Sequence, residues 1–122
     1  MRHLVIDLET AALPNVTEFL DPVSAAKNLV DPVKIKADIE KRTADQIADC
    51  GLDWNLNRIV YAGMWTQADS EPHVFSAPDE TAEREILFEI RSWLGERDRH
   101  NLVGFCIRRF DVPVILQRAR YL

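Results

Sequence analysis

The sequence predicts an α/β domain, and three observations support this class. Short segments rich in β-branched and aromatic residues, such as 58–65, have the composition of strands. Longer segments, such as 79–94, repeat apolar residues at spacings of three and four, as amphipathic helices do. The order is strand, long excursion, two strands, helix, strand, helix. With 122 residues, the chain has the length of one domain with a substantial core.

The first strand is expected over residues 2–8. Its apolar residues hardly alternate with polar ones, which predicts a strand buried on both faces. Residues 11–31 contain two prolines and scattered acids, and are expected to form a long loop with a short helical turn around 16–20.

A helix is predicted to follow, with Asp31 as its cap and Pro32 at its first position. It is expected to run to about Asp49 and to end at Gly51. Its buried side is predicted to carry Ile35, Ile39, Ile47 and Ala48.

The second half begins with strands at 58–65 and 73–77, which are expected to form an antiparallel pair. A helix over 79–94 and a strand over 101–106 follow, with the strand returning parallel to the sheet. In the last helix, Asp111 is the expected N-cap and Pro113 lies in the first turn. One face of that helix is predicted to carry Val112, Ile115, Leu116 and Ala119.

The composition is globular, with 47% hydrophobic and 29% charged residues. The two cysteines offer no disulfide framework, and no stretch approaches the length of a membrane span, so the expected location is the cytoplasm. The net charge of -5 is uneven, because residues 83–122 hold eight arginines against six acids. Arginine matches phosphate geometry, so a phosphate-bearing ligand near this half is one interpretation and solvated helix faces are the other.

Asp7 and Glu9 lie two residues apart where the first strand ends, so their side chains point to the same side. Asp111 follows the strand predicted at 101–106, which would bring three carboxylates to one edge of the sheet. A hard divalent cation would remove their repulsion. The alternative for Asp7 and Glu9 is a solvated strand end or turn, and for Asp111 a helix cap.

The motifs around these acids resemble a known family. "VIDLET" is similar to the D-x-E first motif, and "GFCIRRFDVPVILQRA" to the second motif, of the DEDD-type 3′–5′ exonucleases with a ribonuclease H-like fold. The resemblance is strongest to predicted exonucleases related to the proofreading domain of family B DNA polymerases. It covers the whole chain as a single domain, with an insertion at about 11–56.

The resemblance implies that Asp7, Glu9 and Asp111 are catalytic residues and metal ligands. The implied reaction is hydrolysis of DNA phosphodiester bonds by two Mg²⁺ or Mn²⁺ ions, acting on single-stranded 3′ ends. Thr10, Cys106, Arg109 and Phe110 are the implied substrate contacts, with Phe110 against the terminal base or in the core. Cys106 stands where the family has asparagine.

The family's third motif, a tyrosine or histidine followed by an aspartate, is absent, because no acidic residue follows Asp111. We therefore expect the N-terminal two-thirds of such a domain, holding one metal and hydrolysing little or no DNA. The incomplete sheet is expected to leave apolar surface that a homo-oligomer would cover. The alternatives are a catalytically dead module that binds nucleic acid or a protein through arginines from Arg97 to Arg120, and a structural domain whose acids are caps and turns.

Overall fold

The computed structural model describes residues 2–95 and 100–122, which form a four-stranded mixed sheet, three α-helices and two short 3-10 helices. The α/β class expected from the sequence is confirmed. In chain order the elements are β1 (Arg2–Ala12), η1 (Val16–Phe19), α1 (Pro32–Asp49), η2 (Cys50–Leu52), β2 (Asn57–Thr66), β3 (His73–Ser76), α2 (Glu80–Leu94), β4 (His100–Val103) and α3 (Asp111–Tyr121).

The strand order in the sheet is β3-β2-β1-β4. β1 pairs antiparallel with β2, and β2 pairs antiparallel with β3. β4 pairs parallel with β1 on the other side, from Arg2↔His100 to Val5↔Val103. Both the antiparallel pair and the parallel return predicted from the sequence are confirmed, and β1 becomes a central strand.

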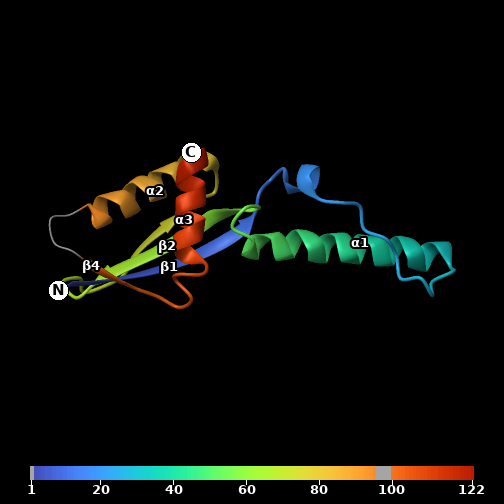
Figure 1. Cartoon of the computed structure of the whole chain (residues 1–122), viewed down its shortest axis with the longest axis horizontal. Coiled ribbons are helices and arrows are strands. Elements are labelled where there is room, and N and C mark those ends of the chain that lie inside the picture. The colour runs from blue at the N-terminus through green and yellow to red at the C-terminus, as the bar shows by residue number, and fades with distance from the viewer. Residues whose placement is uncertain (1, 96–99) are drawn as a thin grey trace.

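The core lies between the sheet and the helices α2 and α3, which both pack on the same face (Figure 1). Alternate residues of each strand face this core. They include Leu4, Ile6 and Leu8 of β1, Ala62 and Met64 of β2, and Ile86, Ile90 and Val114 of the helices.

The prediction that β1 is buried on both faces is wrong. Val5 is only half-buried, and Asp7 and Glu9 are exposed on the face opposite α2 and α3. Alternation is therefore present in β1, but it is hidden in the sequence because Val5 is as apolar as its neighbours. The sheet consequently has one face open around the acids.

The segment between β1 and β2 forms an arm that projects from one end of the sheet (Figure 1). A backbone hydrogen bond of 2.9 Å from Leu13 to Leu56 closes its base. Residues 20–31 run outward alongside α1, which returns to the sheet, and the N–H of Ala26 donates to Asp38 at 2.9 Å (Figure 1). Asp31 caps α1 through the N–H of Val33, as the sequence predicts.

Two details of the prediction for α1 are wrong. No residue of α1 is buried, so Ile35, Ile39 and Ile47 are only half-buried against the arm, and Ala48 is exposed. Gly51 does not end the helix with a left-handed turn, because the chain passes from α1 into η2 with right-handed geometry at Cys50. The apolar spacing in α1 reflects packing within the arm and not packing on the main core.

The last helix also differs from its prediction. Asp111 is its first residue and Phe110 its N-cap, without a side-chain cap hydrogen bond. The buried positions are Asp111, Val114 and Arg118, whereas Leu116 and Ala119 are exposed. Two of the three buried residues on this face are charged, so apolar periodicity does not identify the side of α3 that packs on the sheet.

Candidate functional site

Asp7 and Glu9 lie on the open face of the central strand β1. Cross-strand partners share a face, so Asp7 lies beside Gly63 of β2 and Glu9 lies beside Tyr61. Gly63 has no side chain, and a Cβ there would meet only the Asp7 carbonyl oxygen, at 3.9 Å. The side of Asp7 that faces β2 is therefore not blocked by a side chain at position 63.

Asp111 reaches Asp7 because β4 is short and the chain after it turns sharply. Gly104 passes so close to β1 that a Cβ would lie 2.7 Å from the Ile6 carbonyl oxygen, which excludes any other residue there. Cys106 then takes a left-handed conformation with φ of 52°, and its carbonyl accepts the N–H groups of Arg109 and Phe110 at 3.0 Å each. This turn delivers the first residue of α3 to the edge of β1.

The Asp111 carboxyl group is nearly enclosed, with 3% of the residue exposed. Burial and, second, the negative charge of Asp7 raise its pKa from 3.8 to about 6, while a backbone hydrogen bond from Leu8 opposes the shift. Leu8 can give this bond because β4 pairs with β1 only as far as Val5. The Oδ2 atom of Asp111 is buried and has no hydrogen-bond partner among the described residues.

Two of the three predicted carboxylates are thus brought together. Asp7 and Asp111 interact electrostatically although they lie far apart in the sequence, and Glu9 shares the face of Asp7 two residues further along β1. Within residues 2–95 and 100–122, no group of three or more His, Cys, Asp or Glu side chains is arranged to hold a metal ion. The carboxylates that the structure brings together are those of Asp7 and Asp111.

The four predicted substrate contacts fall in different environments. The hydroxyl of Thr10 donates to the carbonyl of Gly51 and so ties β1 to η2. Cys106 and Arg109 are exposed in the turn before α3, close to Asp111 in the chain. Phe110 packs against the core, which is the second of the two roles expected for it.

The arginine-rich half of the chain is not one basic surface. Arg118 is buried and donates from Nε and Nη2 to the two carboxylate oxygens of Glu83, at 2.6 and 2.8 Å. It is therefore not available to bind a phosphate. Arg97 and Arg99 lie outside the described residues, whereas Arg108 and Arg109 are exposed beside the Asp111 turn.

Sequence reasoning missed two aromatic residues near the acids. Tyr61 is 51% exposed on the open face, and Phe105 is 90% exposed after β4. Tyr61 lies within the strand expected at 58–65 and Phe105 within the strand expected at 101–106, so neither was predicted to be a site residue. The glycine at 63, directly opposite Asp7, was the available signal that this part of β2 approaches the acids.

No protein-family model, curated protein sequence or solved structure gives a significant match to this chain. None of the described helices combines the length and the apolar character that crossing a membrane requires. The assignment of a function depends on the site itself.

Proposed function

We propose that this chain is a metal-dependent 3′–5′ exonuclease-type domain with a ribonuclease H-like sheet, whose cation site is formed by Asp7 and Asp111. The observation that carries the proposal is the buried Asp111 Oδ2 atom, which has no hydrogen-bond partner among the described residues and belongs to a carboxyl group whose pKa the charge of Asp7 raises. A buried acceptor left in this state costs free energy, and a bound cation would remove that cost.

The residues present fit a hard divalent cation such as Mg²⁺ or Mn²⁺. Such ions take oxygen ligands and are often held by only one or two carboxylates plus water and substrate phosphate. Asp7 and Asp111 would hold the ion, and water and a substrate phosphate would complete its ligands. When bound, the ion would supply Lewis-acid polarisation of a phosphodiester group.

The positions of Asp111 and Arg109 suggest a separate role for each side chain. Asp111 is the first residue of α3 and is buried, so packing limits where its carboxylate can lie. The exposed Arg109 lies in the turn next to it and would bind a phosphate of the substrate. Because no acidic residue follows Asp111 in the sequence, we expect hydrolysis by this chain alone to be weak or absent.

Calorimetric titration with MnCl₂ tests the cation site. The unaltered chain should bind manganese, and both Asp7→Asn and Asp111→Asn should remove the heat. Asp45→Asn is a suitable control, because Asp45 is exposed on α1 in the arm. Absence of manganese binding to the unaltered chain at neutral pH would contradict the proposal.

A catalytically dead module that binds nucleic acid is the second candidate. The observation in its favour is that only two carboxylates meet among the described residues, whereas a complete two-metal site uses more than two. Manganese binding together with binding of single-stranded DNA, but no cleavage over a long incubation, would favour the module. Cleavage that Asp7→Asn abolishes would favour the enzyme.

A further inference from the structure

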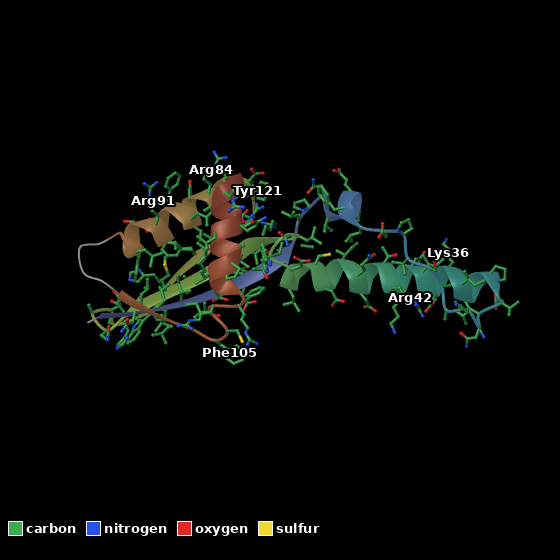
Figure 2. All side chains as sticks on the ribbon, viewed as in Figure 1. Lys36, Arg42, Arg84, Arg91, Phe105 and Tyr121 are labelled. Atoms are coloured by element: carbon green, nitrogen blue, oxygen red, sulfur yellow. The ribbon has the colours of Figure 1, made fainter. Side chains whose placement is uncertain are left out.

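The face of the sheet opposite α2 and α3 carries exposed rings on both sides of Asp7. Tyr61 stands on β2 beside Glu9, and β2 is one neighbour of β1. Phe105 follows β4, which is the other neighbour of β1. Figure 2 shows Phe105 below the sheet, on the side away from α2 and α3. The two rings therefore flank the strand that carries the acids.

The chain places Phe105 close to the site by a tight contact. Gly104 lies against the carbonyl of Ile6, the residue before Asp7, and Phe105 is the next residue. At 90% exposure, its ring makes almost no contact with the rest of the protein. The turn that positions Asp111 thus also holds an aromatic ring out into solvent, one residue after the contact between Gly104 and Ile6.

Apolar and basic groups continue this surface. Val74 of β3 pairs with Gly63, and Val103 of β4 pairs with Val5, so both face the open side and both are exposed. Arg108 and Arg109 are exposed in the turn after Phe105. Rings, aliphatic side chains and guanidinium groups are what proteins use to bind the bases and phosphates of single strands.

We propose that this open face is a stacking platform for single-stranded DNA, with Tyr61 and Phe105 as base-stacking residues and Arg108 and Arg109 as phosphate contacts. The proposal rests on the function proposed above and identifies how the substrate is held. A single strand fits better than a duplex, because stacking on protein rings requires bases that are not already paired and stacked.

The acids argue against a protein partner on this face. A protein that covered Asp7 and Glu9 would remove water from two carboxylates, which is costly unless that protein also supplied cationic side chains to pair with them. A DNA strand leaves them hydrated or in contact with a cation that its own phosphate also binds. The acids in the centre and the arginines at the side match a phosphate backbone that reaches the site with a divalent ion.

Fluorescence anisotropy with a labelled single-stranded oligothymidylate, carrying phosphorothioate linkages to prevent cleavage, tests the platform in Mg²⁺ buffer. Phe105→Ala and Tyr61→Ala should each weaken binding at least about fivefold, the lower limit for loss of one base stack. Phe88→Ala and Tyr121→Ala are matched controls, because both side chains are exposed on the helices and away from Asp7. Tyr61→Phe should keep the affinity of the unaltered chain, since it keeps the ring.

The phosphate contacts have a separate readout. The slope of log affinity against log salt concentration should fall by about 0.7 for each single-strand phosphate contact that is lost. Arg109→Ala should therefore reduce the slope, whereas Arg91→Ala should not, because Arg91 lies on the far side of α2 (Figure 2). A duplex of the same sequence should bind more weakly than the single strand.

The outcomes separate this platform from the proposed cation site. If both Phe105→Ala and Tyr61→Ala bind DNA as tightly as the unaltered chain, or if the controls lose as much, the platform is wrong even where manganese binds. If manganese gives no heat but the two ring variants lose DNA affinity and their controls do not, the platform stands and the hydrolase proposal fails. DNA-free association of the chain that Phe105→Ala abolishes would show a protein interface and overturn the platform.

Discussion

Among the residues that the structure describes, two carboxylates are buried, and their surroundings differ sharply. Glu83 of α2 is fully buried, and its oxygens accept the N–H of Ile59 at 2.9 Å and the guanidinium of Arg118 at 2.6 and 2.8 Å. Asp111 of α3 is almost as deeply buried, but its charged neighbour is another acid, Asp7. One of its oxygens has no hydrogen-bond partner among the described residues.

Glu83 stabilises the fold, whereas the ionised form of Asp111 destabilises it. Glu83 connects α2, β2 and α3, so its charge is compensated in the folded chain itself. Asp111 contributes repulsion and desolvation instead, and nothing in its described surroundings offsets them fully. Perturbed carboxylates cluster at functional sites, and so the contrast supports the proposal that Asp111 is a site residue.

The largest effect is expected from removing the compensated acid. Glu83→Ala leaves the Arg118 guanidinium and the Ile59 N–H buried without an acceptor, which should lower the free energy of unfolding by about 3–5 kcal/mol. Urea denaturation followed by circular dichroism measures the loss. The exposed Glu85→Ala on the same helix is the control, with an expected change within about 0.5 kcal/mol. Equal stability of the two variants would show that the pair contributes little.

Replacing Asp111, the uncompensated acid, should raise the free energy of unfolding at neutral pH instead of lowering it. Because the folded-state pKa of Asp111 is about 6 and its ordinary value is 3.8, folding takes up a proton between about pH 4 and pH 6. The free energy of unfolding should therefore fall as the pH rises through this window, by about 3 kcal/mol in total from this group. Asp111→Asn in metal-free buffer should be more stable than the unaltered chain at pH 7.5, with little gain at pH 4.

Chemical denaturation at a series of pH values measures this difference. The two stability curves should diverge between about pH 4 and pH 6. Curves that stay parallel over the whole range would mean that Asp111 ionises as freely in the folded chain as in the unfolded one. Adding MnCl₂ should stabilise the unaltered chain and leave Asp111→Asn unchanged.

A smaller effect is expected from the neighbouring charge. Asp7→Asn should lower the pKa of Asp111, because the charge of Asp7 is the second cause of the shift. Burial, the first cause, remains and outweighs the opposing hydrogen bond, so the pKa should stay above 3.8 and the decrease should be smaller than the full shift from 3.8 to about 6. The ¹³C shift of the Asp111 carboxyl carbon, followed by NMR titration, reports it. An unchanged midpoint would mean that the two acids do not interact.

The smallest effect concerns the turn that carries Asp111 to its site. Cys106→Gly should stabilise the chain by about 1 kcal/mol or less, because glycine removes the left-handed strain at φ of 52° but adds freedom to the unfolded chain. Thermal melts compare it with Arg108→Gly in the same turn, which gains only the unfolded-state freedom and should be less stable than the unaltered chain. A loss of stability in both variants would indicate that Cys106 is not strained.

Much of the fold followed from local signals in the sequence. The caps at Asp31 and the proline beside it placed α1, and β-branched runs placed β2 and β3. The meeting of Asp7 with Asp111 also followed, because both acids come at the ends of strands that a parallel connection makes neighbours. Such features depend on residues close in the chain and on the limited ways in which strands can be connected.

Other features depended on partners that no local pattern identifies. The apolar spacing of α1 predicted a core helix, but its half-buried residues pack within the arm. From the sequence, Arg118 was one of several arginines that could bind a phosphate. In the folded chain it is paired with Glu83 instead. Neither Tyr61 nor Phe105 was predicted to be a site residue, and the packing of α2 and α3 on one face of the sheet leaves both exposed.

The sequence by itself determined the elements and the edge of the sheet where the acids gather, because capping, alternation and strand order are encoded over short distances. The tertiary structure alone decided which buried charge is compensated and which face of the sheet is open. Those outcomes depend on which side chains meet across the packed layers, and the energy of a buried charge is set by its partners and not by its own identity.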